Sequence, residues 1–490
     1  MIGKKTKIVS TVGFNSEKPE ILKKMYAAGV NVFRLNFSHG SHEWHGKVID
    51  NIRKLKLGAA IMLDTKGPEI RTGEVRNKLS VSVGDSFIVT INQGIYEDVG
   101  KLSVNYKGFV KDVDEGDILV FDSGVMMAKV VKKNKTDVTL KVVEGKADIV
   151  SKRHINLMGK PVNLPTVTEQ DWKDIDFGIE KGVDFIALSF ARSGKDVEEV
   201  REYCQKRNAN IKIISKIENF EATKNLEDII EKSDGIMVAR GDLSCEIPFE
   251  TVPILQKRIV SGCLFYQKPV IVATQMLLSM VDNIRPTRAE VSDVANAVYE
   301  LADAVMTSEE TTKGIDPVNV VNVMSRVVMA AEKDIYGSLS DLDDGDGSEA
   351  DNCDCDCDCD CGCNCGCGCG NNEIMPMFPD LTDDIEAIAV ISDNGSFTGA
   401  AAAKRLSLPI FSFTGDEKLA QQLNLTWNVT PIYEKNIGDD FEKNLNITDK
   451  FMKEQGFIQY LAIFDAKVRR KGEKAMASHP TIQARDLSRV

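Results

Sequence analysis

Eight short apolar runs alternate with amphipathic stretches along this 490-residue chain, and this alternation limits its fold more than any other feature. The runs read TKIVSTVG, NVFRLNFSHG, AAIMLDTKG, DFIALSF, IKIISKIEN, GIMVARGD, PVIVATQM and AVMTSEET. Stretches such as KPEILKKMYAAG and KDVEEVREYCQKRN lie between them and repeat apolar residues every three or four positions, as amphipathic helices do. Eight strand–helix units that close on themselves predict a (β/α)8, or TIM, barrel, whose functional sites lie at the C-terminal ends of the strands.

A stretch of different character interrupts the alternation after the third run. Residues 69–160 contain KLSVSVGDSFIVTI, GDILVFDSGVMMAKVV and TDVTLKVVEG, in which apolar and polar residues alternate between Gly and Asp turns. We therefore expect an inserted all-β domain, with the barrel built from residues 1–68 and 161–340. Residues 373–490 return to strand and helix patterns and predict a C-terminal α/β domain.

One low-complexity segment, residues 341–372, dominates the composition. It holds nine of the twelve cysteines, in CDCDCDCDCGCNCGCGCG, and much of the acidic excess behind the net charge of −13. Cys-x-Cys spacing suits thiolate clusters of Zn²⁺ or Cu⁺, which leaves open a metal-binding protein that uses the barrel as a scaffold. An insertion without a role fits better, because no His or aromatic residue organises the tract.

The rest of the composition concerns location and partners. Outside the tract only Cys204, Cys245 and Cys263 remain, the charges nearly balance, and no uncharged apolar run reaches the about 18 residues of a membrane span. The start, MIGKKTKIVSTVG, has no signal-peptide core. We expect a cytoplasmic protein without a membrane or nucleic-acid partner.

Polar residues gather where the strands of a barrel would end. They are Arg34, Asn36 and Ser38 after the second strand, Asp64 and Thr65 after the third, Lys216 and Glu218 after the fifth, Asp242 after the sixth and Thr274 after the seventh. Side chains alternate along a strand, so Lys216 and Glu218 share a face. Single charged residues at strand ends are usually only solvated, but five strand ends together favour a site. Carboxylates for Mg²⁺ and cations for phosphate oxygens predict phosphoryl transfer.

The segment SHGSHEWH holds three of the five histidines and invites a metal-site interpretation. Ser38 and Ser41 suit the cap of a following helix equally well, and no matching acidic ligand neighbours the segment. The helix cap is the better interpretation.

Several of these segments resemble the motifs of pyruvate kinase, which transfers phosphate from phosphoenolpyruvate to ADP. They are TKIVSTVG, NVFRLNFSHG, LDTKGPEIRTG, SKIEN, GIMVARGDL, ATQML and RPTRAEVSDVANAV, and they span about residues 4–335 in order. The resemblance implies a barrel, a β-domain that closes over it as a lid, a C-terminal α/β domain, and usually a homotetramer.

The resemblance also assigns roles around the phosphoryl group. Lys216 of SKIEN would neutralise the migrating phosphoryl group, and Arg34 would contact it. Glu218 and Asp242 would hold Mg²⁺ between the phosphoryl group and the substrate oxygens. Thr274 resembles the threonine near the enolate face, where a proton is delivered to form pyruvate.

The remaining roles concern the substrate carboxylate, a monovalent cation and the nucleotide. The amides around Gly241 and Asp242 would receive the carboxylate. The K⁺ ligands implied by the motifs are Asn36, Ser38, Asp64 and Thr65. Glu69 is the acidic residue that accompanies K⁺ dependence in the family, where Lys can replace the ion. The nucleotide contacts would be His39, Arg71, Lys152 and Arg153, and Asp122 resembles an acidic residue of the lid.

Some residues depart from the family pattern. Glu309 stands where Gly is usual, Ser244 and Cys245 replace Gly and Val, and His154 and Met158 replace Gly and Pro at the lid boundary. Added negative charge near an anion site weakens binding, so a catalytically weakened paralogue that acts as a binding or regulatory subunit is the alternative. An active, Mg²⁺- and K⁺-dependent glycolytic enzyme is the preferred interpretation.

Overall fold

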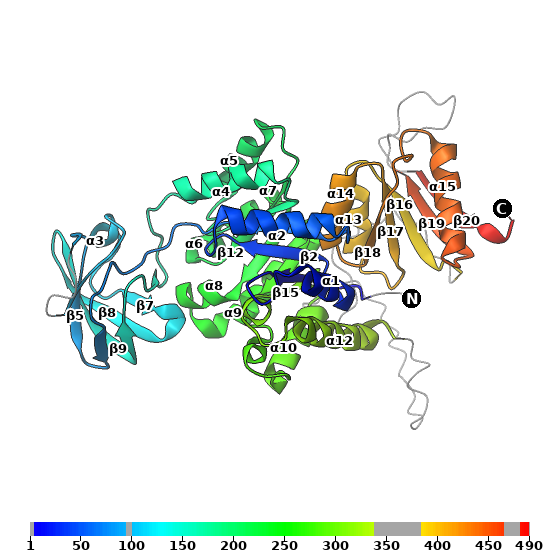
Figure 1. The fold of residues 1–490 in the computed structure, drawn as a ribbon. Coiled ribbons are helices and arrows are strands. Elements are labelled where there is room, and N and C mark those ends of the chain that lie inside the picture. Colours follow the sequence, from blue (N-terminus) through cyan, green and yellow to red (C-terminus); the bar gives the residue numbers. More distant parts are fainter. Residues whose placement is uncertain (1–3, 95–99, 338–383, 465–480, 490) are drawn as a thin grey trace, which may run out of the picture.

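The computed structural model describes residues 4–94, 100–337, 384–464 and 481–489. Eight parallel strands close into a barrel in the order β1, β2, β3, β11, β12, β13, β14, β15 (Figure 1). They are β1 (Lys7–Thr11), β2 (Val32–Asn36), β3 (Ala60–Asp64), β11 (Phe185–Leu188), β12 (Lys212–Ile217), β13 (Gly235–Ala239), β14 (Val270–Ala273) and β15 (Ala304–Thr307). Each strand lies within one of the eight apolar runs, so the predicted barrel is confirmed.

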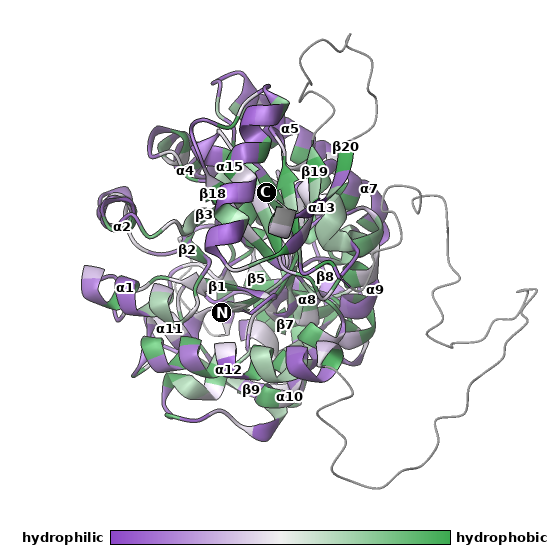
Figure 2. Cartoon of the chain, turned by 90° about the vertical axis from the view of Figure 1, so that its right-hand side faces the viewer, coloured by the Kyte–Doolittle hydropathy of each residue, from purple (hydrophilic) through white to green (hydrophobic). Residues whose placement is uncertain are grey.

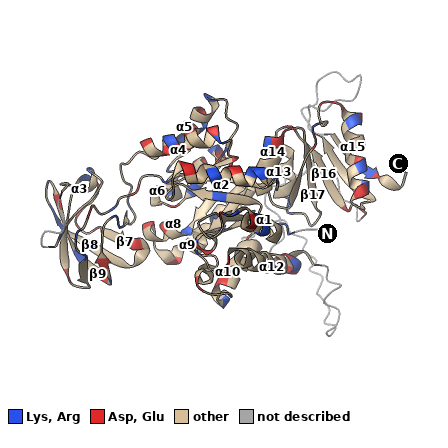
Figure 3. Ribbon diagram, viewed as in Figure 1, with Lys and Arg blue, Asp and Glu red and all other residues tan. Residues whose placement is uncertain are grey.

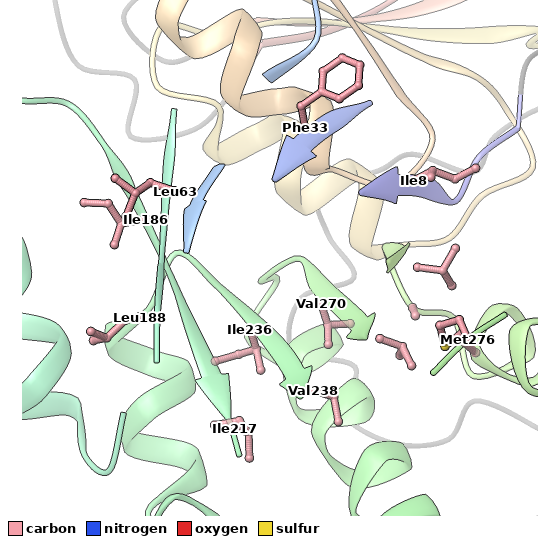
Figure 4. Packing of buried hydrophobic residues seen from close by; sticks show 14 of the residues in the cluster. Ile8, Phe33, Leu63, Ile186, Leu188, Ile217, Ile236, Val238, Val270 and Met276 are labelled. Carbon is pink, nitrogen blue, oxygen red and sulfur yellow. The ribbon is translucent and has the colours of Figure 1, made fainter. Parts of the chain in front are cut away.

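Helices cover the outside of the barrel. They are α1 (Pro19–Ala28), α2 (His42–Lys54), α4 (Glu169–Glu180), α5 (Gly194–Gln205), α6 (Phe220–Lys224), α7 (Leu226–Lys232), α8 (Arg240–Glu246), α9 (Val252–Phe265), α10 (Arg288–Tyr299), α11 (Glu309–Thr312) and α12 (Pro317–Tyr336), with 3-10 turns η2 (Phe249–Thr251) and η3 (Leu278–Val281). Outward strand residues such as Phe33, Leu63 and Ile186 pack against them (Figure 4). Ser41 caps α2 by accepting the Trp44 N–H, as predicted.

The inward residues of the strands form a second, separate cluster that fills the barrel. Val9, Ile214, Met237 and Met306 belong to it, and it also includes Leu425 from the C-terminal domain. Side chains at alternate positions of a strand share a face. The next inward positions along β2, β3 and β12 hold polar side chains. The barrel therefore changes from an apolar filling to a charged mouth at its C-terminal end.

The inserted domain lies between β3 and α4 in the chain. Its elements are β4 (Leu79–Ser82), β5 (Ser86–Thr90), β6 (Lys101–Ser103), α3 (Phe109–Asp112), β7 (Ile118–Phe121), η1 (Asp122–Gly124), β8 (Met126–Lys133), β9 (Asp137–Ile149) and β10 (Ile155–Leu157). The sheet has the order β10, β7, β8, β9, β5, β6, with β4 paired to β9. Phe87, Phe121 and Leu140 belong to its own core, and its turn η1 contacts α8 of the barrel.

The C-terminal domain lies at the opposite end of the barrel from the inserted domain (Figure 1). Its elements are β16 (Ala387–Ile391), α13 (Ser396–Ala403), β17 (Ile410–Thr414), α14 (Glu417–Gln422), η6 (Leu423–Leu425), β18 (Val429–Tyr433), α15 (Phe441–Glu454), β19 (Gln459–Phe464), β20 (Thr481–Asp486) and η7 (Leu487–Arg489). The sheet order is β18, β17, β16, β19, β20. The antiparallel edge strand β20 has no counterpart in the sequence prediction.

Buried charges join this domain to the barrel. Lys7 Nζ donates to the Val429 carbonyl at 2.6 Å, and Arg405 pairs with Asp303 at 2.8 Å. Lys418 Nζ lies 2.9 Å from the Asp184 carboxylate. Viewed from this side, α15 is mostly hydrophilic, whereas β19 beside it is mostly apolar (Figure 2).

The low-complexity segment 341–372, with its cysteine tract, lies outside the described residues. In the part that is described, no helix is long and apolar enough to cross a membrane. Acidic and basic residues are mixed along α2, α4 and α5 (Figure 3).

Candidate active site

The charged mouth centres on Lys216, at the end of β12. Its Nζ lies 3.0 Å from Glu218 Oε2 and 3.3 Å from Asp64 Oδ1, and it donates to Ser189 Oγ at 2.8 Å. Burial alone would lower the pKa of Lys216, but the charges of Asp64 and Glu218 outweigh burial and raise this pKa. Lys216 is therefore a permanent cation in a buried setting.

Arg34 completes the cationic side of the mouth. Its Nε donates to Asp64 Oδ2 at 2.6 Å, and its Nη1 donates to Thr11 Oγ1 at 2.9 Å. Burial would raise the pKa of Asp64, but Arg34 and Lys216 outweigh it and keep the carboxylate ionised. Two cations thus converge on one fully buried carboxylate, an arrangement that can attract a phosphoryl group from the open side.

Glu218 and Asp242 form the anionic side. Glu218 Oε1 accepts the Phe190 N–H at 2.7 Å, whereas its buried Oε2 accepts no hydrogen bond although it lies close to Lys216. Burial raises the pKa of Glu218, and the charge of Asp242 raises it further, against the effect of Lys216. The Asp242 side chain, in the first turn of α8, is partly exposed.

These two carboxylates fit a Mg²⁺ ion. An oxygen without a donor in a buried site is suited to a cation, and Mg²⁺ usually takes one or two carboxylates plus waters and substrate oxygens. Among the described residues no group of three or more His, Cys, Asp or Glu side chains is arranged to hold a metal.

The predicted K⁺ ligands meet where β2 and β3 end. Asn36 is paired with Asp64 in the strand register, and Asn36 Oδ1 accepts the Ser38 N–H at 3.1 Å. Thr65 Oγ1 accepts the Ser189 N–H at 3.0 Å. The four residues supply oxygens of the kind that a hard monovalent cation prefers.

Thr274 lies directly after β14 in a turn with an unusual backbone. Its hydroxyl accepts the Gly241 N–H at 2.9 Å and donates to the Ala273 carbonyl at 2.6 Å. Thr274 and Gln275 both have positive φ, at 66° and 56°. The turn brings Thr274 beside Gly241, which precedes the metal-binding candidate Asp242.

Three of the predicted nucleotide contacts, Arg71, Lys152 and Arg153, lie at the boundary of the inserted domain, and each is close to a carboxylate. Arg71 donates to both oxygens of Glu69, at 2.8 and 2.9 Å. Lys152 Nζ lies 3.5 Å from Glu74, and Arg153 Nε lies 3.5 Å from Asp122. The nucleotide would have to compete with these carboxylates for the cations.

His39 lies in the loop between β2 and α2 and is exposed to solvent. Partial burial lowers its pKa, and so does the charge of Lys313, so it is a neutral donor or acceptor near pH 7. The other two histidines of this segment are engaged elsewhere, since His42 pairs with Asp174 at 2.6 Å and the His45 ring stacks on Phe37. This gives no support to a metal site in the segment.

The departures from the family motifs are mostly accommodated. Glu309, in α11, pairs with Lys313 at 3.2 Å and is more than half exposed. Ser244 Oγ donates to the Gly241 carbonyl at 2.8 Å, and Cys245 is buried in the same short helix. His154 Nδ1 lies 3.8 Å from Asp242 Oδ1, so the lid boundary approaches the metal-binding candidate.

The sequence analysis missed residues that support the site. Ser189 connects Lys216 and Asp64, and Glu246 accepts a hydrogen bond from Asn156 of the lid at 3.0 Å. Arg240 contacts the Thr274 turn. Ser189 lies next to the end of the fourth apolar run and has the same parity as its inward residues Phe185 and Ala187, a signal that could have revealed it.

Comparison with known proteins gives a consistent result. The family model described as pyruvate kinase, barrel domain, matches residues 3–321, and the model described as pyruvate kinase, alpha/beta domain, matches residues 380–465. A pyruvate kinase of Borreliella burgdorferi is 40% identical over 464 residues, covering 94% of this chain and 92% of the relative. The chloroplastic isozyme G of Nicotiana tabacum is 38% identical over 93% of this chain and 78% of the relative.

A solved structure agrees with these sequences. The crystal structure of a pyruvate kinase from Cryptosporidium parvum has a TM-score of 0.82 and 31% identity, and the match covers 99% of this chain and 96% of that one. The match therefore includes the eight-stranded barrel, the inserted sheet and the C-terminal α/β domain of this chain. The chain therefore belongs to the pyruvate kinase family.

Proposed function

We propose that the residues of the barrel mouth carry out the family's reaction, transfer of the phosphoryl group of phosphoenolpyruvate to ADP, with the roles that the sequence predicted. The single observation that supports this most is the buried contact of Lys216 with Glu218 and Asp64, with Arg34 on the other oxygen of Asp64. Phosphoryl transfer depends mainly on positioning and on neutralising charge. Lys216 and Arg34 supply permanent positive charge to the transferring group.

Glu218 and Asp242 would hold Mg²⁺, and Mg²⁺ when bound would neutralise substrate oxygens. The Oε2 of Glu218, which accepts no hydrogen bond, supports this assignment. The amides of Gly241 and Asp242 would receive the substrate carboxylate, while Asn36, Ser38, Asp64 and Thr65 would bind K⁺. Glu69, which stays ionised beside Arg71, is consistent with a need for this cation.

Protonation of the enolate is the step that we assign to the side of Thr274. In this structure the Thr274 hydroxyl accepts a hydrogen bond from the Gly241 N–H and donates one to the Ala273 carbonyl. A substrate carboxylate that takes the Gly241 N–H frees a lone pair of the Thr274 hydroxyl, which can then accept a hydrogen bond from a water and orient it. His39, Arg71, Lys152 and Arg153 would contact the nucleotide phosphates.

The homotetramer, the cytoplasmic location and the division of the chain at residues 69, 161 and 373 stay predictions. The weakened-paralogue alternative, which Glu309 and the altered C-terminal domain suggested, receives no support from the contacts of Glu309, because this residue pairs with Lys313.

The test is pyruvate formation from phosphoenolpyruvate and ADP with Mg²⁺, in K⁺ and then in Na⁺, for the wild type and Lys216→Met. We expect K⁺-dependent turnover that falls by about 10²- to 10³-fold in the variant, because a positive charge directed at the transition state is lost. Lys212→Met, which changes a partly exposed lysine at the other end of the same strand, is the matched control. Equal rates for the wild type and Lys216→Met would refute the assigned role.

A further inference from the structure

The backbone at the Thr274 turn requires support from its surroundings. Thr274 and Gln275 are consecutive non-glycine residues with φ of 66° and 56°. A side chain in the left-handed region is disfavoured, and such residues persist only where neighbouring groups hold them. The groups that hold this turn therefore determine the orientation of the Thr274 hydroxyl.

One side chain binds the backbone on both sides of that strained position. Arg240 Nε donates to the Ala273 carbonyl at 3.0 Å, and Arg240 Nη2 donates to the Thr274 carbonyl at 2.7 Å. The guanidinium also contacts Met276 Sδ. A planar fork of donors can hold two carbonyls at a fixed separation, whereas the ammonium of a lysine cannot.

The guanidinium is itself held from a third element. Asp293 on α10 accepts two hydrogen bonds from it, both at 2.7 Å, and Gln256 Oε1 lies 3.4 Å from Nη1. The Arg240 side chain is only 15% exposed. Its position is thus determined by α10 and α9 as well as by the turn.

We propose that Arg240 is a positioning residue for the reaction, acting through the Thr274 backbone; the inference rests on the role proposed for Thr274. Arg240 directly precedes Gly241, whose N–H donates a hydrogen bond to the Thr274 hydroxyl. When a substrate carboxylate takes that amide, the hydroxyl loses its donor partner. From then on the carbonyl contacts of Arg240 keep Thr274 aimed.

The first test compares Arg240→Gly and Arg240→Lys with the wild type. We expect kcat to fall about 10²-fold in both, as for a displacement of about 1 Å at a reacting group, with KM for ADP changed less than about twofold. Added guanidinium at low millimolar concentration should restore part of the kcat of Arg240→Gly. Arg207→Gln, which breaks another arginine–aspartate pair on the barrel, controls for general effects of the change and of guanidinium.

A second readout isolates the protonation step. The exchange of pyruvate methyl protons for deuterium, followed by NMR in D2O, should slow in Arg240→Gly at least as much as kcat. Asp293→Asn, which keeps Arg240 but weakens its anchor, should show a smaller loss of the same kind and serves if Arg240→Gly does not fold. Unchanged kcat and exchange in Asp293→Asn, or loss in Arg240→Gly without rescue at an unchanged melting temperature, would overturn the inference.

Thr274→Ala separates the proposed role of Thr274 in protonation from the proposed positioning role of Arg240. A silent wild type would refute the proposed function itself. If Thr274→Ala retains full exchange, the role of Thr274 falls and the role of Arg240 falls with it. If Thr274→Ala is impaired while Arg240→Gly is not, only the positioning inference is refuted.

Discussion

Lys216 Nζ lies 3.0 Å from Glu218 Oε2 at the mouth of the barrel, and almost none of either side chain reaches solvent. A buried ion pair repays its desolvation only when the remaining atoms of both groups are satisfied. Lys216 achieves this through Asp64 and Ser189, but Glu218 Oε2 has no hydrogen-bond donor. The pair thus leaves one carboxylate oxygen of Glu218 without a hydrogen-bond donor.

Glu218→Gln should remove divalent-metal binding while leaving the fold intact, because the amide has the shape of the carboxylate without its charge. We expect the affinity for Mn²⁺, measured by the EPR signal of the free ion, to fall at least about 10- to 100-fold, the range found even for residues one shell further from a metal. Glu198→Gln, at a partly exposed carboxylate on α5 that pairs with Lys232, is the control and should bind Mn²⁺ like the wild type. An unchanged Mn²⁺ affinity in Glu218→Gln would remove Glu218 from the site.

The sequence predicted this part of the site because it depends on local rules. Alternation along a strand places Arg34, Asp64, Lys216 and Glu218 on inward faces, and the barrel brings those faces together. Arg240 could not be found in this way, since its partners are backbone carbonyls and an aspartate 53 residues later. Leu425 is one of many leucines in the sequence, and its place inside the barrel depends on how two domains meet.

Glu69→Lys should weaken the dependence on K⁺. Glu69 binds Arg71 through both carboxylate oxygens, and a lysine there would bring its own positive charge to the region of the ion. We expect the ratio of kcat in K⁺ to kcat in Na⁺ to approach one, and KM for ADP to rise because Arg71 then faces a like charge. Glu74→Lys, at an exposed carboxylate beside Lys152, should leave the ratio unchanged. The same ratio in Glu69→Lys as in the wild type would contradict the K⁺ assignment.

Glu309→Gly should have little effect on catalysis. Glu309 and Lys313 are both more than half exposed, and such pairs contribute about 0 to 1 kcal/mol. We expect kcat and KM for phosphoenolpyruvate within about twofold of the wild type, and a slightly lower melting temperature because glycine weakens a helix. A tenfold gain in kcat/KM would instead favour the weakened-paralogue alternative.

Leu425→Ala should destabilise the barrel from the C-terminal domain. Leu425 is 1% exposed and belongs to the cluster inside the barrel. Truncating a buried leucine costs about 2 to 5 kcal/mol. Hydrogen exchange should accelerate in β1 and β15, whereas Leu423→Ala, whose side chain packs within the C-terminal domain, should accelerate exchange in that domain. Faster exchange confined to the C-terminal domain in both variants would show that Leu425 does not support the barrel.

Lys7 should make the stability of the protein depend on pH in a defined window. Its Nζ is buried against the Val429 carbonyl, and burial lowers its pKa from 10.5 to about 8 despite the nearby charges of Glu332 and Asp303. Below pH 8 both the folded and the unfolded chain carry the proton, so the folded state bears the full cost of burying a charge. Between pH 8 and 10.5 the unfolded chain binds more protons, and the contribution of Lys7 to stability rises with pH.

The measurement is the free energy of unfolding of the wild type minus that of Lys7→Met, from pH 7 to pH 10. This difference should shift in favour of the wild type by about 2 to 3 kcal/mol, and the subtraction removes groups that titrate equally in both proteins. Lys4, whose pKa burial and Lys7 together lower to about 7, will titrate higher in the variant and enlarge the shift. Lys23→Met, at an exposed position of α1, is the control for replacing a lysine by methionine. A flat difference for Lys7→Met would mean that its ammonium is stabilised at the domain interface more strongly than its burial opposes it.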